Sequence, residues 1–201
     1  MNRVFGSKAV LWYDGEQYAG LMKGAVMRRI LIVIDMQNDF IDGSLGTKEA
    51  QAIVKPAVER IAAYDPADIY ATRDTHTENY LDTQEGKNLP VPHCIKDTDG
   101  WEIRREIKGL IPEEHIFDKP TFGSLQLAET MRGVFEAEDG QAEFMLIGLC
   151  TDICVVSDAL LLKAYMPEAP IQVDASCCAG VTPEKHIAAL ETMRSCQIQV
   201  L

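Results

Sequence analysis

Ile30-Leu-Ile-Val-Ile-Asp35 is a run of five branched apolar residues that ends in a carboxylate. A continuous apolar run of this length, in place of an alternating one, is typical of a strand buried on both faces of a parallel sheet. A carboxylate directly after such a run is costly to bury unless it is paired or used. We therefore interpret the run as a buried strand and Asp35 as a candidate functional residue.

Apolar runs of the same kind recur along the chain and alternate with helical patterns. Strands are predicted at 30–34, 68–72, 115–117, 144–149, 171–174 and 197–201. Helices are predicted at 50–64, near 101–107, and at 124–134, 152–165 and 183–195. The last helix is marked by Thr182 as N-cap and Pro183 at its first position. This alternation predicts an α/β fold with one doubly wound sheet of six mainly parallel strands and helices on both faces.

Composition limits the class of protein. The 201 residues, of which 47% are hydrophobic, suffice for one domain with a full core. A net charge of −12 disfavours nucleic acid and anionic membrane surfaces as partners. The apolar runs are far shorter than the roughly 20 residues that span a bilayer. Six cysteines without a secretory segment are expected to be reduced thiols, so a cytoplasmic location is predicted.

Residues 1–26 differ in character from the rest of the chain. Asp14-Gly15 lies between two short apolar runs and suits the tight turn of a hairpin arm. The alternative is an over-extended start, because Met27 stands directly before the first predicted strand. We prefer this alternative and expect residues 27–201 to form a single domain, with 1–26 as an atypical segment.

The ends of the predicted strands carry the residues most suited to chemistry, because ligands of open α/β sheets bind beyond the carboxyl ends of strands. Cys154 follows the fourth strand, and Thr151 as N-cap would place it in the first turn of the next helix. Unsatisfied backbone N–H groups there favour a thiolate and could hold an oxyanion. Cys154 is thus a candidate nucleophile, the alternative being a small buried residue in a tight turn.

Asp35 and Lys119 complete a candidate catalytic group around Cys154. Lys119 ends the third predicted strand, as Asp35 ends the first. An aspartate that accepts the thiol proton, with a lysine that keeps the aspartate ionised, would activate the nucleophile. A purely structural ion pair between the two residues is the alternative.

The longest irregular region, 74–100, contains a second set of candidate ligands. Asp74 and His76 follow the second strand, and His93 lies later in the same loop. One carboxylate and two imidazoles are a workable start for a divalent metal site, with Glu85 or Asp82 as the fourth ligand. Loops of this length are commonly functional.

Three motifs, in this order, resemble those of the isochorismatase-like cysteine hydrolases, a family that includes nicotinamidases and pyrazinamidases. The motifs are Ile34-Asp-Met-Gln-Asn-Asp-Phe40, Phe117-Asp-Lys-Pro-Thr-Phe-Gly-Ser124 and Gly148-Leu-Cys-Thr-Asp-Ile-Cys154. The resemblance covers residues 29–201 and implies a three-layer α-β-α fold. It also implies a catalytic triad of Asp35, Lys119 and Cys154.

The resemblance implies further features of the site. The peptide bond before Cys150 would be cis, and the amides of Cys150 and Cys154 would form an oxyanion hole. The implied reaction is amide hydrolysis through a thioester, and Phe40 is a candidate for stacking on the substrate. Family members are commonly oligomeric, so a homo-oligomer is expected.

Nicotinamidases also bind a divalent metal that contacts the pyridine nitrogen of the substrate. Asp74, His76 and His93 match three ligands of that metal, and zinc is the first candidate, before iron, manganese or magnesium. For the fourth ligand we prefer Glu85 to Asp82, because Gln84-Glu85-Gly-Lys-Asn-Leu-Pro90 resembles a stretch that supplies a glutamate in some members.

The resemblance leaves three functions to compare. The chain lacks the aromatic residue that many nicotinamidases carry just ahead of the last metal histidine. The resemblance makes nicotinamide the first candidate among small amide substrates, and the missing aromatic residue leaves a carbamoyl or ureido compound as the alternative. A catalytically silent member that binds a ligand or partner is the third hypothesis.

Overall fold

The computed structural model describes residues 27–201, so the expectations for residues 1–26 lie outside it. Within the described part, six parallel strands form one sheet in the order β3-β2-β1-β4-β5-β6. This confirms the predicted α/β fold. The strands are β1 (Arg28–Ile34), β2 (Ile69–Asp74), β3 (Ile116–Lys119), β4 (Ala142–Leu149), β5 (Ile171–Ala179) and β6 (Gln199–Val200).

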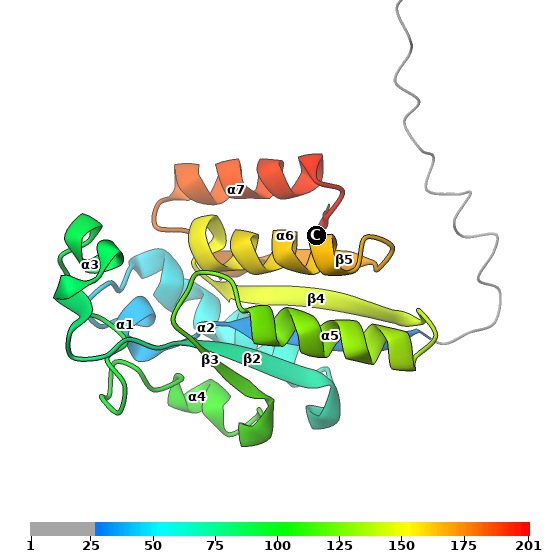
Figure 1. Cartoon of the computed structure of the whole chain (residues 1–201), viewed down its shortest axis with the longest axis horizontal. Coiled ribbons are helices and arrows are strands. Elements are labelled where there is room, and N and C mark those ends of the chain that lie inside the picture. Colours follow the sequence, from blue (N-terminus) through cyan, green and yellow to red (C-terminus); the bar gives the residue numbers. More distant parts are fainter. Residues whose placement is uncertain (1–26) are drawn as a thin grey trace, which may run out of the picture.

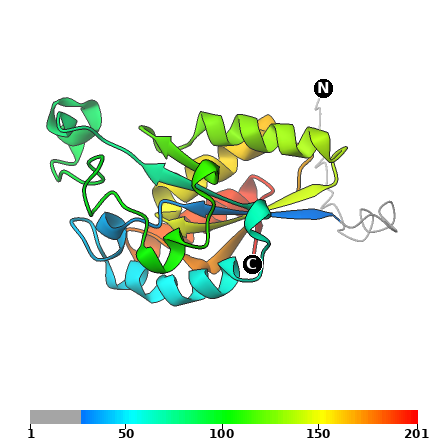
Figure 2. The ribbon, with the colours of Figure 1, turned by 90° about the horizontal axis from the view of Figure 1, so that it is seen from below.

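Helices cover both faces of the sheet and give the molecule three layers (Figure 1, Figure 2). Alternate residues of β1 explain this, since Leu31 and Val33 face one core and Ile30 and Ile32 face the other. The first core is closed by α1 (Asn38–Ile41), α2 (Lys48–Ile61) and α4 (Arg105–Lys108). The second is closed by α5 (Leu125–Ala137), α6 (Val156–Tyr165) and α7 (Pro183–Ser195).

The strand order reverses between β1 and β4, which are neighbours in the sheet although two strands separate them in sequence. Crevices for ligands form at such switch points, beyond the carboxyl ends of the strands. The long connection after β2 adds a short 3₁₀ turn at Tyr80–Asp82 and helix α3 (Gln84–Asn88). Helix α3 protrudes from the end of the molecule in Figure 1. None of the helices in the described part is long and apolar enough to cross a membrane.

Thr182 and Pro183 begin α7 as predicted, and the Thr182 hydroxyl accepts a hydrogen bond from the Lys185 N–H. The bounds of four strands differ from the prediction by one or two residues, and the lengths of the last two differ by more. Strand β5 continues five residues beyond the predicted end at Asp174, whereas β6 is reduced to Gln199–Val200. A strand that continues past a polar residue, or that lies at the edge of a sheet, has a weaker apolar signal than a central strand.

Gly148, near the end of β4, is expected to tolerate no side chain. Its φ is +122°, and a Cβ would lie 2.1 Å from the carbonyl oxygen of Ile34. We expect Gly148→Ala to destabilise the protein by several kcal/mol, or to prevent soluble expression. Gly133 is the matched control, because it lies in α5 with open space around its Cα. Gly133→Ala should raise the melting temperature, and a stable Gly148→Ala variant would contradict the close packing of β4 on β1.

Candidate active site

Asp35, Lys119 and Cys154 lie together at the carboxyl ends of three strands. The Lys119 Nζ is 2.7 Å from Asp35 Oδ2 and 3.5 Å from Cys154 Sγ. The exposed fractions of the three residues are 0%, 2% and 5%, respectively. The ammonium thus bridges a carboxylate and a thiol inside the protein, an arrangement that combines a base, a cation and a nucleophile.

Burial and mutual charge set the proton affinities of this group. Burial raises the pKa of Cys154 well above its ordinary value, and the Asp35 charge adds to this while Lys119 opposes it. Burial also raises the pKa of Asp35, against the opposing effect of Lys119. For Lys119 the burial effect lowers the pKa, but the nearby negative charges outweigh it and the pKa is raised. The amine therefore stays a cation.

Thr72 holds the Asp35 carboxylate, and no pattern in the sequence had pointed to it. Its hydroxyl donates to Asp35 Oδ1 at 2.6 Å, and both residues are completely buried. A threonine within an apolar strand is a weak indication of a functional residue, because the groups that it can contact depend on which other strand lies beside its own strand. Here β2 lies beside β1, so Thr72 faces the end of β1.

The turn that carries Cys154 differs in detail from the prediction. The expected N-cap role of Thr151 is wrong: Cys150 occupies the cap position, and Thr151–Val155 forms a π-helical turn before α6. The Thr151 hydroxyl instead hydrogen-bonds to His186 Nδ1 of α7 at 2.8 Å, because Thr151 is completely buried against that helix. Cys154 still lies in the first helical turn, and the Leu149–Cys150 peptide bond is cis.

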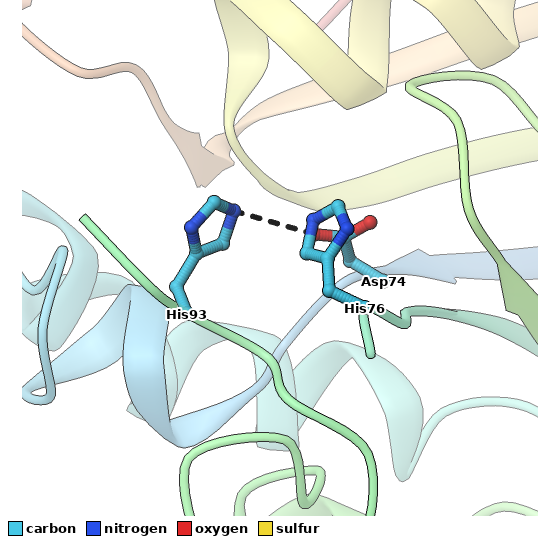
Figure 3. Close-up of side chains that lie close together, drawn as sticks. All are labelled: Asp74, His76 and His93. Atoms are coloured by element: carbon cyan, nitrogen blue, oxygen red, sulfur yellow. Dashed lines mark ion pairs between the residues drawn. The ribbon is translucent and has the colours of Figure 1, made fainter. Parts of the chain in front are cut away.

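Asp74, His76 and His93 form a buried cluster whose candidate ligand atoms all lie within 4.8 Å of one another. Asp74 Oδ2 is 3.1 Å from His76 Nε2 and 3.6 Å from His93 Nε2 (Figure 3). Glu85 Oε1 from α3 is 3.7 Å and 3.6 Å from the same two nitrogens. Asp82 is exposed on the preceding turn.

The donor set of this cluster fits a divalent metal. The buried His76 Nε2 has no hydrogen-bond partner among the described residues. The Nδ1 of His93 hydrogen-bonds to the carbonyl of Val91 at 2.9 Å, a contact that fixes the ring and leaves Nε2 directed at the cluster. Two imidazoles and two carboxylates are ligands that zinc and related ions accept. The Phe40 ring lies beside this group, with its centroid 5.5 Å from that of His93.

Gln37 joins the two clusters, a role that was not predicted from the sequence. Its Oε1 accepts the Asp74 N–H at 2.7 Å, and its Nε2 donates to the Asp74 and Trp101 carbonyls at 2.8 Å each. Asp74 is thereby fixed between the two histidines and Lys119, whose Nζ is 3.9 Å from Asp74 Oδ1. Gln37 is completely buried, and buried amides require partners. The only signal in the sequence was a polar residue two positions after Asp35, directly beyond an apolar strand.

The chain is similar in sequence and structure to proteins of a known family. The isochorismatase domain model matches residues 29–201. The nicotinamidase/pyrazinamidase of Mycobacterium tuberculosis is 27% identical over 187 residues, covering 86% of this chain and 98% of that protein. Among solved structures, the pyrazinamidase of Pyrococcus horikoshii in complex with zinc is 29% identical, with a TM-score of 0.72 over 87% of this chain and 98% of that one.

A third similar protein is named for a substrate other than nicotinamide or pyrazinamide. The N-carbamoylsarcosine amidase of Thermoplasma acidophilum is 25% identical, with a TM-score of 0.66 over 87% of this chain and 95% of that one. All three matches span nearly the whole of the related proteins, and the family model covers the described part of the chain almost completely. The chain therefore belongs to the isochorismatase family.

Proposed function

We propose that the protein is a cysteine amidohydrolase that cleaves nicotinamide to nicotinate and ammonia. Its enzyme class is that of a hydrolase acting on an amide carbon–nitrogen bond, the class of its nicotinamidase relatives. The observation that carries the mechanism is the position of the Lys119 ammonium between Asp35 and Cys154. Beside them lies the cluster of Asp74, His76 and His93, called the metal-type cluster below. Its candidate metal ligands support an aromatic amide with a ring nitrogen as the substrate.

In the proposed reaction, Asp35 accepts the proton of Cys154 and the thiolate attacks the amide carbon. The burial that raises the pKa of this thiol disfavours its ionisation to solvent, so the neighbouring carboxylate has to take the proton. The amides of Cys150 and Cys154 would hold the oxyanion. When the carbon–nitrogen bond breaks, Asp35 returns the proton to the departing ammonia. Asp35 then activates the water that hydrolyses the thioester and regenerates the thiol.

Lys119 has two functions in this proposal. Its positive charge opposes the burial that raises the Asp35 pKa and so favours the ionised carboxylate, and it compensates the negative charge as the thiolate forms. Asp74, His76, Glu85 and His93 would hold a divalent metal, with zinc as the first candidate, which supplies a Lewis-acidic contact for the substrate ring. Phe40, beside His93, would stack on that ring.

A panel of amides tests the function. We expect ammonia release from nicotinamide and from pyrazinamide, measured with a coupled assay that detects free ammonia. N-carbamoylsarcosine and simple ureido compounds belong in the same panel, because an N-carbamoylsarcosine amidase is among the structural relatives. The absence of an aromatic residue just ahead of His93 also favours this second candidate class. No ammonia from any member of the panel would refute the amidase assignment.

Metal removal should lower nicotinamide turnover. We expect chelation to reduce activity at least about tenfold, and His76→Ala to reduce metal affinity by a similar factor or more. Metal content after dialysis, measured by mass spectrometry, gives a readout independent of activity.

Glu85 and Asp82 offer a matched pair for the same measurement. Glu85→Ala should weaken metal retention because its carboxylate faces both histidines, and the exposed Asp82→Ala should not. Equal retention by the two variants would show that Glu85 is not a ligand.

We also propose that the protein works in the cytoplasm as a homo-oligomer. Oligomerisation was expected from the family resemblance and a reduced environment from the cysteine content. Light scattering coupled to size-exclusion chromatography measures the oligomeric state directly, and a mass close to the 22.3 kDa of one chain would refute the oligomer.

A further inference from the structure

A buried carboxylate that the proposed reaction does not use lies four residues after the nucleophile. Asp158 belongs to α6, the helix that continues the turn containing Cys154, and only 1% of it is exposed. Burial of a carboxylate at such a position is costly, so the groups that compensate it are informative about its role. Neither the motifs nor the family resemblance had singled out this residue.

One oxygen of Asp158 binds the segment that carries Lys119. Its Oδ1 accepts the backbone N–H of Ser124 at 2.7 Å, and Ser124 is the N-cap residue of α5. At the other end of the same segment, the Lys119 Nζ donates to the Thr121 carbonyl at 3.1 Å. The 119–124 segment thus begins at the end of β3 and is held at Ser124 by Asp158, which connects it to the helix that continues the Cys154 turn.

The other oxygen of Asp158 has no such partner. Asp158 Oδ2 is buried without a hydrogen-bond partner among the described residues. Burial raises the pKa of Asp158 to about 7; the Ser124 N–H and Lys119 oppose this increase, and Asp35 adds to it. The charged groups that act on it are thus Asp35 at the end of β1 and Lys119 on β3, with the Cys154 thiol on its own helical segment.

We propose that Asp158 is a positioning residue of this site, which ties the Lys119 segment to the helix that follows the nucleophile through its hydrogen bond with the Ser124 N–H. The inference rests on the proposed cysteine amidase function and extends it. The tie would preserve the distance between the amine and the sulfur, on which the proton transfer depends.

Two substitutions separate the tie from the charge. Asp158→Asn keeps an oxygen that can accept the Ser124 N–H but removes the negative charge. Asp158→Ala removes both. The matched control is Asp174→Asn, which neutralises another buried carboxylate, 2.6 Å from Arg60 on α2.

The experiment follows the rate of alkylation of Cys154 by iodoacetamide as a function of pH, with the modified cysteine identified by peptide mass spectrometry. We expect the apparent pKa of the thiol to rise in Asp158→Ala, because Lys119, which lowers this pKa, is no longer held beside the sulfur, and to stay near the wild-type value in Asp158→Asn. The kcat for ammonia release should fall about tenfold or more in Asp158→Ala, with little change in KM, and by less than about threefold in Asp158→Asn. Asp174→Asn should change neither quantity.

A wild-type kcat in Asp158→Ala would overturn the tie, as would a loss in Asp158→Asn as large as that in Asp158→Ala. Asp158→Asn retains the acceptor and guards against an alanine variant that fails to fold. Alkylation requires no amide, so its result stands even if nicotinamide is the wrong substrate. A wrong substrate would be recognised separately, because the wild type would then release no ammonia from it.

Discussion

Cys154→Ala is expected to reduce ammonia release from nicotinamide by roughly a thousandfold or more, because the variant has no atom that can form the thioester. The loss should appear in kcat, while substrate binding is largely retained. Single-turnover measurements should detect no acyl-enzyme by mass spectrometry, whereas the wild type should accumulate one if thioester hydrolysis is slow. The substitution replaces a small buried side chain with a smaller one, so the fold should survive.

Cys196→Ala is the matched control for the nucleophile. Cys196 is exposed at the end of α7, remote from the three strand ends that carry the candidate triad. It should retain wild-type activity. Full activity in purified Cys154→Ala would remove the thiol from the mechanism and leave the metal-type cluster as the site of chemistry.

The sequence allowed the fold to be predicted because each central strand is continuous and apolar. The run 30–34 has no polar residue to suggest an exposed face, and β1 is indeed covered on both sides. Topology then follows from β-α alternation, since parallel strands require helical crossovers. The same reasoning indicated that Asp35, Lys119 and Cys154 would meet, because each follows a different strand at the same edge of the sheet.

The sequence could not show contacts that depend on the order of strands or the packing of two helices. Thr72 reaches Asp35 only because β2 is the neighbour of β1, and Asp158 reaches Ser124 only because α6 packs beside α5. Thr151 was assigned as a cap from local preference alone, but its burial against α7 gave it a tertiary partner instead. Spacing alone likewise could not decide between Glu85 and Asp82 as the fourth candidate ligand, because the path of the loop determines which carboxylate faces the histidines.

Lys119→Met should cause the largest combined loss of activity and stability. Methionine is similar in length but uncharged, so Asp35 would be left buried with its hydroxyl partner Thr72 and no cation. Removing one member of a buried ion pair typically destabilises a protein by about 3–5 kcal/mol. Activity should fall about a hundredfold or more, because the base and the developing thiolate both lose their compensating charge.

The pH dependence of this destabilisation has a definite sign. Lys119 lowers the pKa of Asp35, so in Lys119→Met that pKa rises further above its unfolded value. A carboxyl group whose pKa is raised in the folded state favours folding at low pH, and this stabilisation is lost as pH rises towards the folded pKa. The difference in melting temperature between wild type and Lys119→Met should therefore be larger at pH 8 than at pH 5. An equal difference at both values would contradict an uncompensated Asp35.

The double variant Asp35→Asn/Lys119→Met distinguishes a lost ion pair from lost packing. If the unpaired charge of Asp35 is the main cause of instability, neutralising it should restore most of the stability that Lys119→Met loses, and the pH dependence should disappear. Activity should not return, because the double variant has neither the base nor the cation. Recovery of stability without recovery of activity would assign the pair to catalysis, since the fold would then be shown to persist without either charge.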